Sequence, residues 1–290
     1  MKKTAFILIC TLCAGLILTG CKDKDNRSMT IIEKTAFAGS DIQDIIIDGP
    51  FTVKISDDAS TGVRFRVNEY LEGNISYLLN GTTLRIKLND GAVVKNSTLD
   101  IQIGCNSVKT LDIEGGCSAE MDRGFDVTGD AIISVAEASN LTANAYLNYQ
   151  GSLTITLSGA SSFTTNSDIS TSGELAILVN GASNVSIENL VAGGPSSIVL
   201  EDASELTVAG MVSNSTEPFN ITLKEASSIK ASDFRVPLLN IEASGASHAS
   251  VKVSNKLTAN LTGASKLEYK TEGNVNVDVH TSGGSSATQL

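Results

Sequence analysis

The chain has 290 residues, with 21 Lys and Arg against 32 Asp and Glu, two His, no Trp and a formal net charge of −11. This acidic balance disfavours nucleic acid and anionic lipid as partners, because both would be repelled. The sequence also contains no phosphate loop and no dinucleotide fingerprint, which excludes the common nucleotide-dependent enzyme classes. Its one Cys-x-x-Cys spacing, Cys10 and Cys13, lies in the apolar segment near the N-terminus.

The N-terminus has the layout of a secretory signal. Two lysines precede an apolar segment from Thr4 to Leu18, which is too short to span a bilayer comfortably. The segment ends Leu18-Thr19-Gly20-Cys21, which resembles the lipobox of bacterial lipoproteins, where cleavage precedes the Cys and the Cys receives lipid. We therefore predict a lipoprotein signal peptide over residues 1–20 and lipidation of Cys21. An ordinary signal peptide and an uncleaved anchor are the alternatives.

Residues 21–36 are predicted to be a polar tether after the lipidated Cys21. Lipid at this position would hold the protein on a membrane, in the cell envelope at the outer membrane, facing either the periplasm or the surface. Cleavage before Cys21 would leave 19 basic and 32 acidic residues, a net charge of −13. Cys105 and Cys117 would then be the only thiols in an oxidising compartment, either as a disulfide or as two buried free thiols.

Residues 37–110 are predicted to form an irregular β cap. Apolar residues alternate on both sides of Asp48-Gly49 and on both sides of Asn80-Gly81, and the second pair is a strong hairpin signal. No charged or low-complexity linker separates this part from residues 111–290. We expect the cap to cover the first edge of the structure formed by those residues, which would otherwise be open to aggregation.

Residues 111–290 contain nine copies of one pattern. Each copy has two alternating apolar residues, a Gly slot, a small slot, a Ser slot and two more alternating apolar residues, as in Ile155 to Phe163. The Ser slot falls at 117 (a Cys), 139, 161, 183, 204, 227, 247, 265 and 285. A period near twenty residues with two-residue alternation indicates a β-solenoid. We predict an all-β fold, a β-solenoid of about nine coils continuous with the cap.

The slots predict how each coil bends. The Gly slot holds Glu137, Asp202 and Glu225 in three copies, so it should face water at a corner. The small slot holds only Ala or Gly, and we expect it to point inward. The Ser slot is expected to form a hydroxyl ladder, bonded to the backbone or to the next Ser. A structural role in nine copies explains these serines better than catalysis.

Several of these features occur together. They are the lipobox, the strand Asp48-Gly49-Pro50-Phe51-Thr52-Val53, the Asn-Gly hairpin, and the Ser-Gly-Ala-Ser copies at Ser158 to Ser161 and Ser244 to Ser247. This combination resembles the head GIN domain family of exported proteins, described as auto-transporter adhesins. The resemblance covers roughly residues 37 to 287. It implies a non-enzymatic adhesin and supplies no catalytic residue, binding residue or cofactor.

Few residues suit catalysis or metal binding. The neighbours Asp57 and Asp58 lie in a turn-like segment, so a solvated turn explains them better than a glycosidase pair. His248 and His280 fall in different registers of the repeat and lack an obvious acid or nucleophile partner. The acidic Gly slots are not all on consecutive coils, and the repeat lacks a calcium signature. We expect no catalytic residue, no metal site and no cofactor.

Tyr146 and Tyr149 are the one closely spaced aromatic pair in the repeats. We treat them as a candidate exposed contact patch, with packing against the coil as the alternative. Our leading hypothesis is a cell-envelope lipoprotein that acts as an adhesin or interaction scaffold through a repetitive face, with a surface glycan or protein as ligand. The alternatives are a glycan-binding or polysaccharide-degrading solenoid and a purely structural envelope component. The sequence does not fix the oligomeric state.

Overall fold

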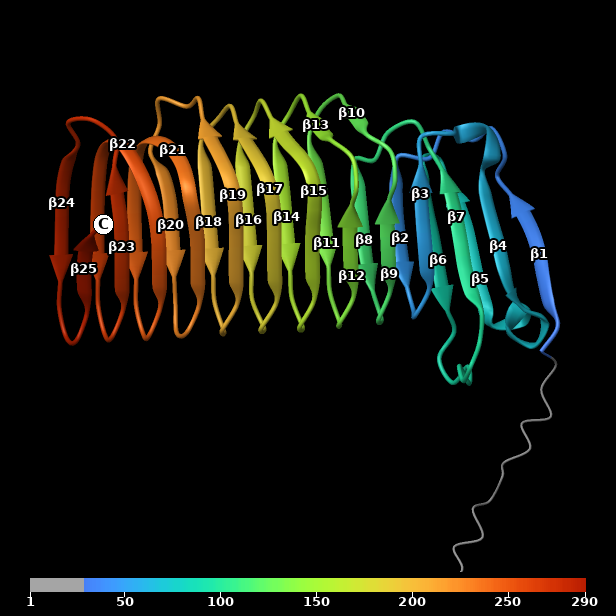
Figure 1. Ribbon diagram of the computed structural model, residues 1–290. Helices are drawn as coiled ribbons and strands as arrows, with labels where there is room; N and C mark the ends of the chain where they lie inside the picture. Colours follow the sequence, from blue (N-terminus) through green and yellow to red (C-terminus); the bar gives the residue numbers. More distant parts are fainter. Residues whose placement is uncertain (1–28) are drawn as a thin grey trace, which may run out of the picture.

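The computed structural model describes residues 29–290, so the predicted signal peptide, Cys21 and the first part of the tether lie outside the described residues. About 60% of the chain is strand, arranged as a β-solenoid of about eight turns. The stack is elongated and runs from a cap at its N-terminal end to the last coil near the C-terminus (Figure 1). The predicted all-β solenoid is confirmed. The nine copies of the repeat correspond to about eight full turns, because eight turns lie between the first and the ninth copy.

The N-terminal elements are β1 (Ile31–Ala36), β2 (Asp44–Asp48), β3 (Thr52–Ser56), η1 (Ala59–Thr61), β4 (Val63–Asn68), η2 (Glu69–Asn74), β5 (Ile75–Asn80), β6 (Thr83–Leu88) and β7 (Leu99–Gly104). The repeats comprise β8 (Thr110–Glu114), β9 (Ser118–Met121), β10 (Phe125–Val127), β11 (Ala131–Val135), β12 (Asn140–Ala143), β13 (Leu147–Tyr149), β14 (Leu153–Leu157), β15 (Ser162–Thr171), β16 (Leu175–Val179), β17 (Asn184–Ala192), β18 (Ser196–Leu200), β19 (Glu205–Ser213), β20 (Phe219–Leu223), β21 (Ser228–Ala243), β22 (His248–Leu261), β23 (Lys266–Thr271), β24 (Asn276–Thr281) and β25 (Ser286–Gln289).

The cap closes the N-terminal end of the stack with antiparallel strands. β4 pairs antiparallel with β1 on one side and with β7 on the other, and β5 pairs antiparallel with β6. The β5–β6 turn is the predicted Asn-Gly hairpin, with Gly81 at a φ of 61°. These pairings cover the first parallel coil, whose edge would otherwise expose unpaired backbone groups.

Two boundaries differ from the sequence prediction. β1 lies within the predicted tether, where it forms the outer strand of the cap. β2 and β3 lie within the predicted cap but form a complete parallel coil, because β2 pairs with β6 and β8, and β3 pairs with β7 and β9. The chain therefore forms its first coil with β2 and β3 and then builds the cap against one side of that coil. The repeats begin against the other side of the same coil.

A central coil has three strand segments around a dry core. β14 leads through the corner turn into β15, whose register breaks between Thr165 and Asp168 and so divides it into two segments. Each segment pairs in parallel with its equivalent one coil away, as β14 does with β16 and β15 with β17. The inward residues Leu153, Ile155 and Leu157 are each 0% exposed. Alternation therefore places one apolar column above another, about 4.8 Å apart.

The C-terminal coils are narrower because the third segment disappears. In β21 only Phe234 and Arg235 continue that segment, opposite Met211 and Val212. β22 then has two segments, one paired with β23 and the other with β24. The Ser-slot positions follow this change, since 204 and 227 are separated by a full three-segment coil and 247 and 265 by a shorter one.

Candidate interaction surface

Each repeat copy bends at an exposed corner turn. In the fifth copy Asp202 and Ala203 have φ values of 54° and 62°, and Ser204 N donates to Glu201 O at 3.2 Å to close the turn. Non-glycine residues occupy this left-handed region at a cost of roughly 1–2 kcal/mol each. Such pairs of positive φ values occur in the first five copies, at Gly115–Gly116, Glu137–Ala138, Gly159–Ala160, Gly181–Ala182 and Asp202–Ala203.

The predicted inward orientation of the small slot is wrong. The side chains of Ala138, Ala160, Ala182 and Ala203 are exposed, and the following Ser is the first residue to point inward. Both central residues of a two-residue turn point away from the core, so the Gly slot and the small slot face solvent together. The small slot stays small because consecutive turns stack closely, with Ala160 N donating to Gly181 O at 2.8 Å.

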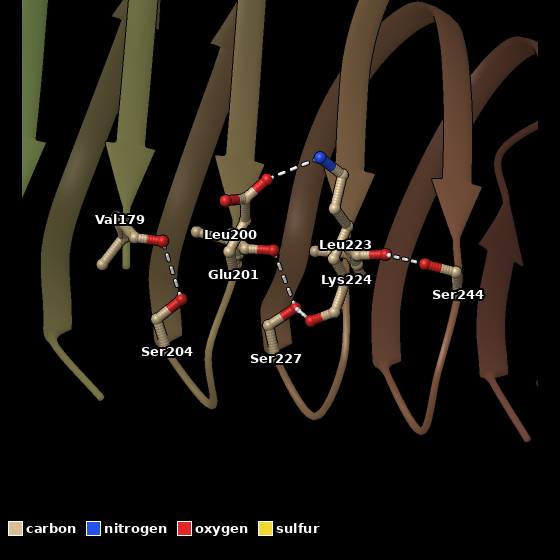
Figure 2. Close-up of polar contacts among 8 residues, drawn as sticks. All are labelled: Val179, Leu200, Glu201, Ser204, Leu223, Lys224, Ser227 and Ser244. Carbon is tan, nitrogen blue, oxygen red and sulfur yellow. Dashed lines mark hydrogen bonds and ion pairs between the residues drawn. The ribbon is translucent and has the colours of Figure 1, made fainter. Parts of the chain in front are cut away.

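The buried serines satisfy backbone groups at this corner. Ser204 Oγ donates to Val179 O of the preceding coil at 2.9 Å. Ser227 Oγ bonds to Leu200 O at 3.0 Å and to Lys224 O at 2.8 Å (Figure 2). The ladder hydroxyls of the described coils bond to the backbone rather than to one another. The ladder is therefore a structural device that pairs buried backbone groups.

Consecutive turns are joined by one backbone hydrogen bond whose direction reverses along the stack. On the N-terminal side the small-slot N–H donates to the following copy, and on the C-terminal side it donates to the preceding copy. Donors of the first kind are Gly116, Ala138, Ala160 and Ala182, and donors of the second kind are Ala246, Ala264 and Gly284. Among the described residues, no such bond joins the turns at Asp202 and Glu225. We call this interface, between the fifth and sixth copies, the seam.

The surface charge also changes at the seam. Residues 111–220 contain 14 acidic residues and one basic residue, Arg123, for a net charge of −13. Residues 221–290 contain seven basic and six acidic residues, and residues 1–110 contain 13 basic and 12 acidic, so each has a net charge of +1. The acidity of the whole chain is therefore confined to the coils before the seam.

One carboxyl on each side of the seam illustrates how the local surroundings shift a pKa. Before the seam, burial raises the pKa of Glu114, and the neighbouring carboxylates of Asp48 and Asp112 raise it further. After the seam, the Lys266 ammonium donates a hydrogen bond to Glu268 and lowers the pKa of that carboxyl. Glu114 thus lies among like charges, whereas Glu268 lies beside a compensating lysine.

After the seam, the outer face of the sheet carries a regular array of polar side chains. β20, β21 and β22 pair in register, and each presents two outward residues and the first residue after the end of the strand. We call these nine residues the polar lattice: Asn220, Thr222, Lys224, Asn240, Glu242, Ser244, Thr258, Asn260 and Thr262. Two shallow depressions of about 350 and about 220 Å³ lie over the lattice. Both are lined by Thr222, Glu242 and Asn260, so they form one continuous surface.

Local contacts order the lattice. Asn240 Nδ2 donates to Asn220 Oδ1 at 3.1 Å. Lys224 Nζ lies 2.6 Å from Glu201 Oε1, at the rim of the lattice, and this pair is visible in Figure 2. Glu242 makes no ion pair with any residue in the described part of the chain. Seven of the nine side chains are neutral hydroxyls or amides, so the surface offers hydrogen-bond donors and acceptors with little net charge.

The structure separates the two predicted tyrosines. Tyr146 is 47% exposed, and its hydroxyl donates to Asp126 Oδ2 at 3.0 Å. Its ring covers Gly124, where an added Cβ would lie 2.3 Å from the ring. Tyr149 is only 1% exposed, because alternation along β13 turns it into the core. The predicted shared patch is therefore wrong for Tyr149, and a ligand contact at Tyr146 stays a prediction.

The other polar candidates occupy local structural roles. Asp58 caps η1 by accepting a hydrogen bond from Ser60 N at 3.1 Å. His248 Nε2 lies 3.5 Å from Glu268 Oε2, and His280 pairs with an aspartate of its own strand at 3.3 Å. Within residues 29–290, no group of three or more His, Cys, Asp or Glu side chains is placed to hold a metal ion. In the same range, no helix has the length and apolar character needed to cross a bilayer.

Cys105 and Cys117 are two buried free thiols. Burial raises the pKa of each to about 12. Cys105 N bonds to Ser56 O at the end of β3, whereas Cys117 adjoins Ser118, which pairs with Thr52 at its start. The ends of this strand are roughly 13 Å apart at 3.3 Å per residue. That separation exceeds the reach of a disulfide.

Parallel coils around a dry core, closed by an antiparallel cap, define this protein as a capped β-solenoid. Residues 132–273 match the family model described as "Putative auto-transporter adhesin, head GIN domain". This match confirms the resemblance seen in the sequence. No curated protein matches the sequence of this chain.

Crystal structures of three proteins from Parabacteroides species share the fold. A "putative adhesin" from Parabacteroides merdae is 17% identical with a TM-score of 0.63, over 91% of this chain and 97% of that chain. A second "putative adhesin", from Parabacteroides distasonis, is 16% identical with a TM-score of 0.62, over 91% and 98%. A "Putative lipid binding protein" from Parabacteroides distasonis is 15% identical with a TM-score of 0.58, over 90% and 97%.

Proposed function

We propose that this protein is a non-enzymatic adhesin or interaction scaffold of the cell envelope and that it binds through the outer side face of the solenoid. The observation that carries the proposal is the polar lattice, in which equivalent outward residues repeat in register over three consecutive strands. A repeated open surface suits many weak contacts made together better than one deep contact. The family description and the names of two structural relatives agree with this role.

We further propose that the chain is anchored in the cell envelope by lipid on Cys21. The support is the sequence Leu18-Thr19-Gly20-Cys21 after an apolar signal segment. A Cys21→Ser variant is expected to lose lipid labelling and to leave the membrane fraction. Cys13→Ser is the matched control, because it removes a thiol from the signal but leaves the lipobox intact. Lipid labelling of the Cys21→Ser variant would contradict the anchor.

Whole-cell adhesion tests the proposed function. Cells that produce the full chain are compared with cells that produce the Cys21→Ser variant on surfaces coated with polysaccharides and with extracellular proteins. We expect only the anchored chain to increase retention, and we expect soluble Cys21→Ser protein to compete with it. Equal retention of both strains on every coating would exclude the adhesin role. Turnover of any coating that one point mutation abolished would replace it with an enzyme.

A further inference from the structure

We propose that the polar lattice is the ligand-contact site of this face and that its ligand is a neutral, linear glycan. The inference rests on the proposed function, because it names the place and the ligand class of the adhesive contact. Three features carry it: the shape of the surface, the chemistry of its side chains, and its difference from the same face on earlier coils.

The shape is an open trough across three strands. Equivalent side chains on neighbouring strands are about 4.8 Å apart, and outward residues along one strand are about 6.6 Å apart. The depressions of about 350 and about 220 Å³ join along Thr222, Glu242 and Asn260. A trough that is open along its length accommodates an extended chain better than a compact small molecule, which favours enclosure on several sides.

The side chains match hydroxyl groups. Asn220, Asn240 and Asn260 each offer an amide donor and a carbonyl acceptor, and the hydroxyls of Thr222 and Thr258 can donate or accept. The hydroxyls of Ser244 and Thr262 donate to Leu223 O and Ala243 O at 3.5 and 3.4 Å, so they offer a ligand an acceptor. The Glu242 carboxylate has two acceptor oxygens and makes no ion pair within the described chain. A polyhydroxyl ligand can therefore bond to the open donors and acceptors of the trough without carrying charge.

The same chemistry disfavours charged and proteinaceous ligands. Lys224 is the only lattice cation, and Glu201 neutralises it at 2.6 Å, so nothing in the trough attracts phosphate, sulfate or uronate groups. Protein interfaces usually rely on buried aromatic or Arg anchors, and the lattice contains neither. It also offers no aromatic ring on which a sugar could stack. The contact must therefore come from many hydrogen bonds, each of modest strength.

The outer face before the seam differs in one decisive way. There, outward positions equivalent to the lattice are occupied by Ile132 and Leu178, which are 49% and 42% exposed. These apolar side chains interrupt the hydrogen-bonding surface. An unbroken polar surface therefore begins only at β20, where the acidic coils also end.

Binding of the full-length lipoprotein in neutral lipid vesicles tests the inference. The probes are dextran, mannan, galactan and arabinoxylan as neutral glycans, with dextran sulfate as the charged match for dextran and polygalacturonate as a natural polyanion. We expect at least one neutral glycan to bind, with less than a twofold change between 50 and 500 mM NaCl, because no charge pair is being screened. Binding confined to the two polyanions, or to none of the six probes, would overturn the inference.

Variants locate the contact on the lattice. We expect Asn240→Ala combined with Glu242→Ala to weaken binding of the neutral glycan at least tenfold. The control pair, Thr154→Ala with Thr156→Ala, changes the equivalent outward positions of β14 and should alter binding less than twofold. All four residues lie on the surface, and melting curves verify that each variant is folded. Equal binding by the two double variants would also overturn the inference.

Whole-cell adhesion distinguishes this result from failure of the proposed function. If anchored cells adhere while the lattice variant adheres equally well, the adhesin role stands and the lattice is excluded. If adhesion to a neutral glycan disappears with the lattice variant and persists with the control pair, both proposals are supported together.

Discussion

The coils on the two sides of the seam form the same corner turn with different backbone conformations. Before it, two consecutive residues adopt positive φ, the coil has three segments, and residues 111–220 have a net charge of −13. After it, only the Gly slot has positive φ, the coil narrows to two segments, and the charges balance. The core does not change, since Leu200 and Leu223 on either side of the seam are both 0% exposed. The register of the apolar columns therefore sets the fold, and turn type, cross-section and charge vary independently of it.

The largest expected effect tests whether central and terminal coils contribute equally to the core. Phe163, in a central coil, is 0% exposed, and Phe163→Ala should cost about 3–5 kcal/mol of unfolding free energy. Val277, in the last coil, is 36% exposed, and Val277→Ala should cost less than about 1 kcal/mol because little apolar area is lost. Denaturant unfolding measures both values. Equal costs would show that the last coil is as tightly packed as the centre.

The serine ladder should be more sensitive before the seam than after it. Ser183 Oγ accepts a hydrogen bond from Ser161 N at 3.1 Å, so Ser183→Ala leaves a buried N–H unpaired and should cost about 1–3 kcal/mol. Ser247 Oγ instead donates to the carbonyls of Ser244 and Glu225. Ser247→Ala should therefore cost only about 0.5–1.5 kcal/mol. A larger loss for Ser247→Ala in the same denaturation assay would reverse this ranking.

Replacing the small-slot Ala by Gly should stabilise the protein before the seam and destabilise it after the seam. Ala182 has a φ of 60°, so Ala182→Gly removes left-handed strain and should stabilise the protein by about 0.5–1 kcal/mol. Ala246 does not have a positive φ, so there is no left-handed strain for glycine to relieve. Ala246→Gly only increases the conformational entropy of the unfolded chain and should therefore destabilise the protein by a similar amount. Melting temperatures of the two variants settle the comparison. Shifts of the same sign would mean that the two turn types do not differ energetically.

The smallest effects concern charge and also differ in sign. The pKa of Glu114 is raised in the folded state, so its ionisation opposes folding and the loss grows as the pH rises through that pKa. Glu114→Gln should therefore raise the melting temperature at pH 7. The pKa of Glu268 is lowered, so its contribution is present at pH 7 and is lost as the pH falls through the lowered pKa. Glu268→Gln should therefore lower the melting temperature at pH 7.

Acid and salt provide the controls for this pair. Both differences from the wild type should shrink at a pH low enough to protonate the two carboxyls, because Gln then resembles the protonated side chain. Both should also shrink in high salt, since the two sites are near the surface and are screened. Differences that persist under both conditions would point to packing rather than charge.

Local signals accounted for most of the fold. The period and the two-residue alternation predict the stacked coils and their apolar columns, and Asn80-Gly81 predicts the β5–β6 hairpin. The expected inward orientation of the small slot is wrong because a carboxylate in the Gly slot shows only that the Gly slot faces water. It does not show that the turn takes two residues out of alternation. Only the φ values of Ala182 and Ala203 reveal this.

The candidate site was harder to predict because it depends on register between copies of unequal length. Asn220, Asn240 and Thr258 occupy one column, although their spacing along the chain differs. The register break in β15 and the loss of the third segment shift these positions from copy to copy. Tyr149 illustrates the same difficulty, since its burial follows from β13, a segment that the repeat pattern does not mark. Aromatic content, the usual signal for glycan contact, directed attention to that pair instead.

The seam has a mechanical consequence. In a stack where each coil contacts only its neighbours, tension along the long axis passes through every interface in series. The interface between the turns of Asp202 and Glu225 lacks the backbone hydrogen bond that joins the other corner turns, and it is where the third segment shortens. If the N-terminus is held at the membrane and a ligand bound to β20–β22 pulls on the protein, the seam lies between the two points where force is applied. The stack should then part there first, so that the coils before it stay closed under the cap while the later coils extend.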